Sequence, residues 1–580
     1  MIQAPSLKLF NSLTRQLEPF DPVHPGEARV YSCGPTVYNY PHIGNMRAYV
    51  FADTLGRTLS FKGYKLTHVI NITDVGHLTD DGDAGEDKME KMAAQQAQSI
   101  WDIAKHYTQA YWADVDALNI RHPAHWSIAT DFVPQMIEFA KSIADQHCYE
   151  LPTGLYFDTS TVADYGRLAG HDVELLNELS RLTERLRTIP SNLQEPLHIK
   201  TYLSAEIEAF IGVVQRMKRN SPAKKLHSEV LAIFGTMPSP ASDDFLNAFE
   251  KVIGEFKDFQ QRVKNEGRID PVEGKRHAAD FAIWRRTPPG ETRQMEWDSP
   301  WGKGAPGWHL ECSVMSRALL GLPFDIHTGG IDHREIHHPN EIAQNQAIQG
   351  YDAAHGHLDC AAHSGARLWM HNNFLIDRTG KMSKSSGEFL RLQLLIDRGY
   401  HPLAYRMMCL QAHYRSELEF SWDNLGAALT RLKRMLMSAA PLRDVAAAGA
   451  VAHPKLTALL ERFDAAISDD LNTPVALTVL DEALAIKKVP AEEKRALVEA
   501  MESVLGLGLF ALEREALRLR PKTAAIDEGA IAALMDRRKA ARAEKDFAAS
   551  DALRDELLAA GVEVMDGDPL GWEWRLDHGA

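Results

Sequence analysis

Residues 42–45 (HIGN) have the residue types needed to hold a phosphate group. They stand where a short strand-like run gives way to a helical pattern, and backbone N–H groups and the helix dipole at such a place favour an anion such as a triphosphate. Gly44 lets a ligand approach the backbone closely, and His42 can donate a hydrogen bond to a phosphate oxygen. So short a segment also occurs by chance, and it predicts nucleotide binding only together with other signals.

A second segment, residues 381–385 (KMSKS), carries two lysines and two hydroxyl groups. It follows a glycine turn at Gly380, which is typical of a mobile loop. Closed over a bound nucleotide, Lys381 and Lys384 could stabilise the negative charge of a departing pyrophosphate. The alternative is an exposed basic loop without a catalytic role. A Walker A loop is excluded, because a leucine stands five positions before Gly380 and a methionine follows Lys381.

Four further residues offer ligands for a metal ion. Cys33 ends the first strand-like run, Cys312 lies far along the chain, and His337 and Glu341 are four residues apart, on one face if that stretch is helical. Two thiolates, an imidazole and a carboxylate are a good ligand set for Zn²⁺. Ligands so far apart form no compact signature, and buried cysteines without a metal are the alternative.

The elements around the first segment read as a βαβ unit. Residues 29–32 predict a strand, residues 46–61 a helix stopped at Gly63, and residues 65–72 a second strand. This order indicates a parallel sheet. A second α/β stretch follows much later, and its predicted elements are a strand, a helix and a strand at residues 323–327, 339–348 and 368–376.

The segment between these halves is helical in pattern. Leucines and phenylalanines recur there at helical spacing, and prolines interrupt them, which predicts an amphipathic helical bundle without a catalytic role. From Asn424 onward the chain is again helical in pattern and rich in alanine and leucine. Pro521 marks a boundary before a last small module.

The composition is that of an ordinary soluble globular protein. The 580 residues are 45% hydrophobic and 25% charged, with a net charge of -15 that argues against coating a nucleic acid non-specifically. We find no apolar run of about 18 residues and no secretion signal, so no membrane contact is expected. Five cysteines cannot form a disulfide framework in a chain of this size, and a cytoplasmic location is expected.

The two polar segments together, flanking a split α/β sheet, resemble those of class I aminoacyl-tRNA synthetases. Three further segments are similar to signatures of the cysteinyl-tRNA synthetase family: residues 31–38 (YSCGPTVY), 307–313 (GWHLECS) and 337–344 (HHPNEIAQ). Asn45 stands where many members have His, although other members carry Asn there. Pro339 stands where Glu is common, but it is not a ligand position. The resemblance fails over residues 178–262, an extra insertion to which we assign no role.

The resemblance implies a fold: a Rossmann-like parallel-sheet catalytic domain split by a connective insertion, then an all-α helical bundle and a small C-terminal module. It places the first half of the catalytic domain at residues 1–115, the connective region at 116–265 and the second half of the catalytic domain at 266–365. A KMSKS and stem-contact region follows at 366–425, then a helical anticodon-binding bundle at 426–525 and a small anticodon-recognition module at 526–580.

It also implies an activity. A cysteine–tRNA ligase activates L-cysteine with ATP and Mg²⁺ to cysteinyl-adenylate and pyrophosphate, then transfers cysteine to the terminal ribose of tRNA(Cys). One Zn²⁺ per chain, held by the matching residues, binds the substrate thiolate. The implied ligands are Cys33, Cys312, His337 and Glu341, with His338 orienting the site. Because zinc discriminates cysteine from serine by bond chemistry, no editing domain is needed.

The resemblance assigns other site residues in the same way. The catalytic residues are His42, Asn45, Lys381 and Lys384, and ATP is bound by His42, Gly44, Asn45 and Lys384. Thr73, Trp308 and Asp332 match positions near the substrate, although Trp308 could instead be a core aromatic. A monomer is expected.

The C-terminal half also matches the family. Residues 469–474 (DDLNTP) resemble its helical-bundle signature, and residues 537–557 its anticodon-binding end. Arg538 and Arg542 supply positive charge suited to phosphates, and Trp574 could stack on an unpaired anticodon base. The alternatives are a solvated helix face for the arginines and a small hydrophobic core for the tryptophan.

Three other functions remain open. A related ligase passes cysteine to an amino-sugar, but such paralogues lack the anticodon module that this chain has. A metallohydrolase built on His333, His337 and His338 would need Glu where Arg334 stands. A non-catalytic RNA-binding paralogue would not be expected to keep both catalytic segments.

Overall fold

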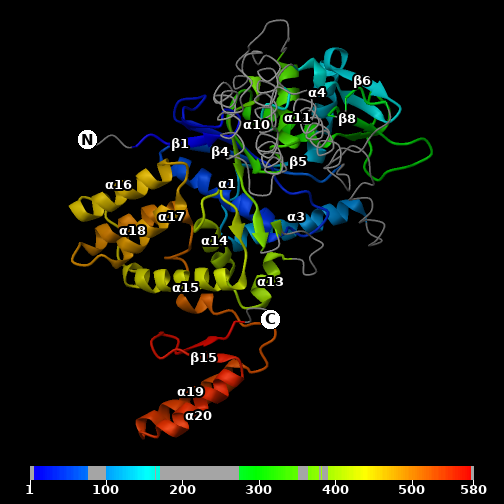
Figure 1. The fold of residues 1–580 in the computed structure, drawn as a ribbon. Helices are drawn as coiled ribbons and strands as arrows, with labels where there is room; N and C mark the ends of the chain where they lie inside the picture. The colour runs from blue at the N-terminus through cyan, green and yellow to red at the C-terminus, as the bar shows by residue number, and fades with distance from the viewer. Residues whose placement is uncertain are drawn as a thin grey trace, which may run out of the picture.

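The structure is a computed structural model of the 580-residue chain, shown as a ribbon in Figure 1. It describes residues 5–75, 99–162, 165–169, 274–277, 279–349, 363–377, 380–381 and 390–576. The insertion predicted at residues 178–262 and most of the KMSKS segment, Lys384 included, lie outside the described residues. No described helix combines the length and apolar character needed to cross a membrane.

A five-stranded parallel sheet forms the centre of the catalytic part. Its strands lie in the order β11-β10-β3-β4-β5. They are β3 (Glu27–Ser32), β4 (Lys65–Ile72), β5 (His125–Ile128), β10 (Phe324–Gly330) and β11 (Ala366–Asn372). The two halves predicted from the sequence therefore meet in one sheet, where Val30 pairs with His68 on one side and Ile326 on the other.

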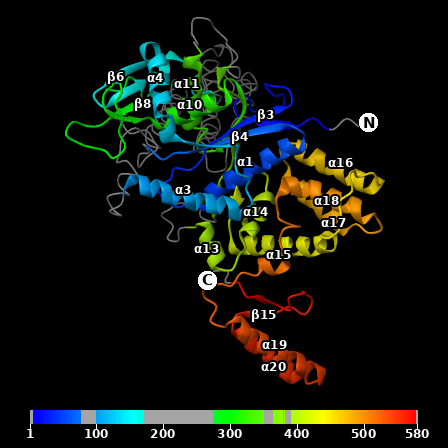
Figure 2. The same cartoon turned by 180° about the vertical axis from the view of Figure 1, so that it is seen from behind.

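Helices cover both faces of this sheet, as Figures 1 and 2 show. On one face, α1 (Ile43–Phe61) packs against the sheet, and on the other lie α10 (Trp308–Leu320) and α11 (His337–Ile348). Helix α1 ends where Gly63 takes a φ of 89°, a conformation that favours glycine. The helix α3 (Ile100–Ala117) packs beside α1.

A second, antiparallel sheet belongs to the connective region. Its strands are β6 (Cys148–Leu151), β7 (Gly154–Phe157), β8 (Phe281–Arg286) and β9 (Gly304–Pro306), and α4 (Val133–His147) packs on it. The strand pairings cross two of the predicted domain ranges. Strand β5 lies in the range predicted for the connective region but pairs with β4, whereas β8 and β9 lie in the range predicted for the catalytic domain but extend the antiparallel sheet.

One predicted strand is divided in the structure. The single strand predicted at residues 368–376 is two strands in different sheets: β11 in the central sheet, and β12 (Leu375–Asp377), which pairs with β13 (Gly380–Lys381) and β14 (Leu418–Glu419). The chain changes sheets at Asn373, whose backbone N–H donates to Tyr414 O at 2.8 Å. Two helices follow, α13 (Leu392–Asp397) and α14 (Pro402–Leu410).

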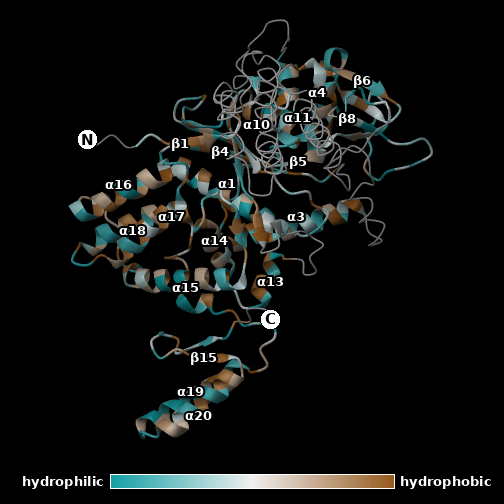
Figure 3. Cartoon of the chain, viewed as in Figure 1, coloured by the Kyte–Doolittle hydropathy of each residue, from teal (hydrophilic) through white to brown (hydrophobic). Residues whose placement is uncertain are grey.

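Four helices then form the bundle: α15 (Trp422–Ala439), α16 (Pro454–Ser468), α17 (Thr473–Ala485) and α18 (Ala491–Leu505). Figure 3 shows hydrophobic and hydrophilic residues mixed along each of them. Their buried side chains join those of the catalytic part in one continuous hydrophobic core, which runs from Ile43 on α1 to Leu505 on α18. The bundle is thus fused to the catalytic part rather than linked to it loosely.

The C-terminal module, by contrast, has a small core of its own. It consists of α19 (Glu528–Ala543), α20 (Phe547–Ala559), β15 (Val562–Val564) and β16 (Trp572–Trp574), and Figure 1 shows it beyond the bundle. Lys433 of α15 pairs with Glu573 of β16 at 2.8 Å and joins the module to the bundle. The remaining elements are the hairpin β1 (Lys8–Asn11) and β2 (Gln16–Pro19) and the 3₁₀ turns Ala129–Phe132, Thr159–Thr161, Ala440–Leu442 and Arg514–Leu517.

Buried charges fasten the bundle to α1. Asp53 accepts from Arg57 Nε and from Arg406 Nη2, each at 2.7 Å. The same guanidinium groups donate to backbone oxygens at the end of α18: Arg57 to Ser503 O and Arg406 to Leu505 O. Burial raises the pKa of Asp53, but the two arginines outweigh burial and lower it overall.

Replacing Asp53 by Ala leaves two buried guanidinium groups without their carboxylate. We expect the free energy of unfolding to fall by about 3–5 kcal/mol, the usual cost of breaking a buried pair. Urea unfolding followed by circular dichroism would measure the change. The control is Asp481→Ala, which removes a partly exposed partner of Arg431 and should cost less than about 1 kcal/mol. Equal losses in the two variants would contradict the prediction.

Candidate metal centre and active site

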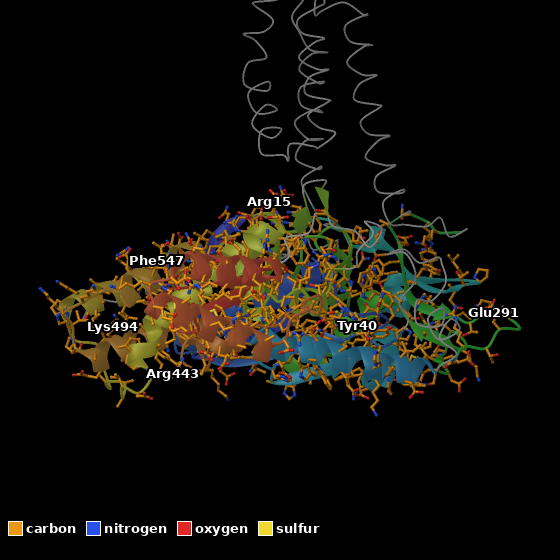
Figure 4. The ribbon with its side chains drawn as sticks, turned by 90° about the horizontal axis from the view of Figure 1, so that it is seen from below. Arg15, Tyr40, Glu291, Arg443, Lys494 and Phe547 are labelled. Atoms are coloured by element: carbon orange, nitrogen blue, oxygen red, sulfur yellow. The ribbon has the colours of Figure 1, made fainter. Side chains whose placement is uncertain are left out.

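A cavity of about 440 Å³ opens at the carboxyl edge of the central sheet. It lies where the strand order reverses, between β3 and β10, which is the usual ligand position in open α/β sheets. Its wall combines residues that follow β3, β4, β10 and β11 with the start of α1, and it includes Tyr40, labelled in Figure 4. Segments far apart in the sequence therefore meet at one pocket.

The turn after β3 brings Cys33 to this edge. Cys33 N donates to Thr328 O of β10, and Gly34 N donates to the Asn71 side chain at 2.6 Å. A Cβ atom on Gly34 would lie 1.6 Å from Asn71 O, so only glycine allows this approach. The turn thereby fixes the Cys33 side chain between two neighbouring strands.

Three further possible metal-ligand side chains meet beside Cys33. The donor atoms of Cys33, Cys312, His337 and Glu341 all lie within 4.8 Å of one another. Helix α10 supplies Cys312, and the first turn and a half of α11 supplies His337 and Glu341, on one face as the spacing predicts. All four residues are buried.

The structure also brings a second donor set together. It consists of Cys33, His327, His338 and Glu341, and shares two members with the first. Only the first set contains both thiols, which suit Zn²⁺ better than one thiol among histidines. In the first set His327 and His338 become hydrogen-bond partners of the ligands rather than ligands.

Burial and neighbouring charges shift the pKa values of all four residues. Burial raises the pKa of Glu341, but His327 and His337 outweigh burial and bring it to about 2. Burial lowers the pKa of His337, but Glu341 and Cys312 outweigh it and raise that pKa to about 10. The pKa of the Cys312 thiol is raised by its hydrogen bond with Cys33 and by burial, and burial raises that of Cys33.

One oxygen of this group is suited to a cation. Glu341 Oε1 is buried and lies 3.1 Å from His337 Nε2, yet among the described residues it has no partner in hydrogen-bond geometry. A divalent cation among the four donors would be coordinated by this oxygen, and it would favour the thiolate forms of Cys33 and Cys312 over the thiols. The residues present therefore fit a metal ion of the zinc type.

Histidines that the sequence reasoning missed hold two of these ligands. Glu341 Oε2 lies 2.9 Å from His327 Nε2, and His337 Nδ1 lies 2.9 Å from His309 Nδ1. Such contacts fix the tautomer and orientation of a ligand. A signal was present, because His327 is a histidine at the end of the strand predicted at residues 323–327, but its partner could not be read from the sequence.

A longer chain of hydrogen bonds leads away from Cys33. Its Sγ lies 3.3 Å from His338 Nε2, and His338 Nδ1 lies 2.8 Å from His371 Nε2. His371 Nδ1 in turn lies 2.8 Å from Ser12 Oγ. His338 thus connects Cys33 to His371, and its orienting role stays a prediction.

The three residues predicted to lie near the substrate, Thr73, Trp308 and Asp332, all line the pocket. Thr73 Oγ1 donates to Glu311 Oε2 at 2.8 Å and accepts from Asn71 Nδ2 at 3.0 Å. Trp308 is half-buried, lines the pocket, and lies over His337 with ring centroids 4.3 Å apart, so it is a wall residue rather than a core aromatic. Asp332 lines the same pocket.

At the nucleotide side, residues 42–45 form a capping box. His42 Nδ1 accepts from Gly44 N at 3.0 Å, Asn45 Oδ1 accepts from His42 N at 3.2 Å, and Ile43 N donates to Leu390 O. The backbone N–H groups that the sequence assigns to an anion therefore have partners within the chain, and the anion contact stays a prediction. Because His42 Nδ1 is an acceptor, a neutral ring carries its proton on Nε2 and can donate there.

Of the KMSKS segment, residues 381–385, the structure describes only Lys381. The backbone of Lys381 pairs with Ile376 of β12, and its side chain lies outside the described residues, as does Lys384. Beyond residues 382–389, which are not described, Arg391 lies over the Tyr40 ring, 4.4 Å from its centroid. The described chain before and after this gap therefore lies against elements of the pocket wall.

The predicted tRNA-binding residues differ in their surroundings. Arg538 is 7% exposed and makes two hydrogen bonds to the Asp566 carboxylate, which Arg542 also approaches, at 3.1 Å. Trp574 is 3% exposed and belongs to the small core of the module. The structure thus supports the core alternative for Trp574, because a covered indole face cannot stack on a base.

Comparison with known proteins places the chain in a family. Residues 19–189 and 192–430 match the tRNA synthetases class I (C) catalytic domain, and residues 528–575 match the cysteinyl-tRNA ligase anticodon binding domain. A cysteine–tRNA ligase of Novosphingobium aromaticivorans is 64% identical over 99% of this chain and 98% of its own. That of Zymomonas mobilis is 45% identical over 98% of each chain, and cysteine–tRNA ligase 1 of Burkholderia lata 39% over 97% and 95%.

These matches span both the part that carries the buried cysteine–histidine–glutamate group and the terminal module, so the chain belongs to the cysteinyl-tRNA synthetase family of class I.

Proposed function

We propose that the chain is a cysteine–tRNA ligase, which activates L-cysteine with ATP and transfers it to the terminal ribose of tRNA(Cys). The observation that carries the proposal is the buried group of Cys33, Cys312, His337 and Glu341 at the edge of a pocket that also contains His42. A metal beside a nucleotide site suits an enzyme that must recognise a thiol before activating a carboxylate. The names of the family relatives support the same activity.

The proposed metal is zinc, held by Cys33, Cys312, His337 and Glu341. When bound, it would supply a soft Lewis acid that favours a thiolate over the alcohol of serine, a distinction that pocket shape alone makes poorly. His327 and His309 hold Glu341 and His337 in the orientation that ligation needs. Because the pKa values of the Cys33 and Cys312 thiols are raised, both thiols hold their protons before zinc binds, and zinc binding releases these protons.

The chain's other residues position the reacting groups. Thr73, Trp308 and Asp332 surround the amino-acid end of the pocket. The substrate carboxylate attacks the α-phosphorus of ATP, and the His42 Nε2–H and Asn45 donate toward the phosphates that accompany Mg²⁺. Lys381 and Lys384 stabilise the pyrophosphate that leaves, and Gly44 gives the nucleotide room.

The terminal module is the proposed reader of the tRNA. The match of residues 528–575 to an anticodon binding domain disfavours the alternative of a cysteine:amino-sugar ligase. Arg542, about half exposed, is the better placed of the two predicted arginines for a phosphate contact, since the charge of Arg538 is offset by Asp566. Trp574 acts through the module's core, not through stacking.

The experiment that tests the function is charging of a tRNA transcript with a GCA anticodon, with serine as the competing amino acid. We expect cysteine to be attached and serine not. Cysteine-dependent pyrophosphate exchange without charging would point to the amino-sugar ligase. Absence of both reactions would point to the RNA-binding paralogue and overturn the proposal.

Replacing a thiol ligand should remove metal and substrate selectivity together. We expect Cys33→Ala and Cys312→Ala to lose most of the bound zinc, as measured by elemental analysis. We also expect the KM for cysteine to rise by at least about 100-fold, because losing a direct ligand weakens metal binding more than losing a hydrogen-bond partner of a ligand does. The matched control is Cys148→Ala on β6, whose thiol is not part of either donor set. Full zinc content in the Cys33 and Cys312 variants would contradict the ligand assignment.

The histidine behind Glu341 should tune the affinity for zinc without abolishing it. His327→Gln removes the contact to Glu341 Oε2 but no proposed ligand. We expect zinc to be bound about 10–100-fold more weakly, the usual effect of losing an outer partner, as measured by competition with a chelator. Complete loss of zinc would instead make His327 a ligand, in favour of the second donor set.

A further inference from the structure

Arg47 of α1 is a buried arginine that binds backbone oxygens rather than a carboxylate. It is 2% exposed, and it makes no ion pair with any described residue. Its Nη1 donates to Asn373 O and Phe374 O, at 2.9 and 2.5 Å. Its Nη2 donates to Ser416 O at 2.6 Å and, more weakly, to His413 O at 3.4 Å. One side chain therefore holds two separate segments of backbone.

The first of these segments is part of the pocket wall. Asn373, Phe374 and Leu375 line the cavity, and a Cβ atom on Gly44 would lie 3.7 Å from Leu375 Cβ. The same segment leads directly into β12, which pairs with the start of the KMSKS segment. A shift of this backbone therefore changes both the nucleotide side of the pocket and the base of the loop.

The second segment, residues 413–416, connects this wall to α1. Asn373 N donates to Tyr414 O, and Asn373 Nδ2 donates to Arg415 O, at 2.8 and 2.9 Å. The Tyr414 ring stacks on Phe51, one helical turn after Arg47, with centroids 4.4 Å apart and planes inclined by 14°. Its position is thus determined by α1 on one side and by the pocket wall on the other.

A residue of the bundle completes the arrangement. Asp470 lies between α16 and α17, is 3% exposed, and accepts from Tyr414 Oη and from Arg415 Nε, each at 2.6 Å. It also accepts from Phe10 N of the N-terminal hairpin. Asp470 and Leu471 have φ values of 53° and 57°, a costly backbone for two successive residues other than glycine. The DDLNTP segment is therefore more than a helix cap.

We propose that Arg47 and Asp470 are positioning residues for adenylate formation, and that residues 413–416 transmit the position of the bundle to the nucleotide side of the pocket. This inference rests on the proposed function. Neither residue touches a substrate; both act through the backbone of residues 373–374. Buried hydrogen bonds to charged groups hold backbone firmly enough for this role.

The geometry predicts which kinetic constants change. The segment lies beside Gly44 and Leu375, whereas the cysteine–histidine–glutamate group lies between β3 and β10. A displaced wall should therefore slow activation and weaken ATP binding, while cysteine binding and zinc content stay the same. Displacements of about 1 Å can cost up to about 100-fold in rate, so a change of about tenfold is well within reach.

The test is cysteine-dependent pyrophosphate exchange with full-length protein carrying Asp470→Asn, Tyr414→Phe or Arg47→Lys. Asn tolerates the left-handed backbone of position 470, and it removes both the charge and the acceptor oxygen toward Arg415. Tyr414→Phe removes a single hydroxyl group and keeps the stacking, so it decides the matter if the other variants fail to fold. We expect kcat to fall about tenfold and the KM for ATP to rise, with the KM for cysteine within about twofold of the unchanged protein.

A double variant tests whether the residues act as one unit. If Arg47 and Asp470 act through the same segment, Arg47→Lys combined with Asp470→Asn should lose less activity than the product of the single losses. The matched control is Asp481→Asn, on the helix that follows Asp470, whose carboxylate pairs with Arg431 inside the bundle. It should leave the kinetics unchanged.

Two outcomes would overturn the inference. A purely structural role would lower the thermal midpoint and leave kcat and both KM values of the folded variants unchanged at 25 °C. Fully multiplicative losses in the double variant would show that the residues act separately. If the unchanged protein itself shows no cysteine-dependent exchange, the proposed function fails instead, and the two failures are thereby distinguished.

Discussion

The buried carboxylate of Glu341 constrains how the rest of the catalytic part is arranged. Glu341 is fully buried, and only the neighbouring histidines His327 and His337 keep it ionised. An isolated charge in such a place would cost several kcal/mol. Its partners come from β10 and from α11 itself, and the two thiols come from β3 and α10. The central sheet and the two helices on one face are thus arranged around a group that none of them could stabilise alone.

Much of this arrangement could be predicted from local sequence. The strands around α1 and the start of that helix follow from hydrophobic periodicity and the glycine stop at Gly63, and the parallel sheet follows from their order. The choice of Cys33 and Cys312 from five cysteines did not follow from spacing. It needed family signatures, because α10 and β3 are adjacent only in the folded chain.

The features that could not be predicted from the sequence depend on contacts with residues distant along the chain. Strand β5 looks like any short strand, and only its pairing with β4 assigns it to the central sheet. The capping box at His42 uses backbone groups that sequence reasoning had reserved for a phosphate. Trp574 was equally compatible with stacking and with burial, and the contacts of β15 and β16 decided for burial. In each case residue type was informative, but the contact depended on tertiary structure.

The two C-terminal parts are attached in different ways, which has a consequence for how they can be inherited. The four-helix bundle shares one hydrophobic core with the catalytic part, so exchanging it between proteins would require matched changes on both sides. The terminal module closes its own core, from Ile531 to Trp574, and meets the bundle through contacts that include the Lys433–Glu573 ion pair. A recombination event could therefore replace it as a unit, and a chain of this architecture could change its RNA reader while keeping its amino-acid chemistry.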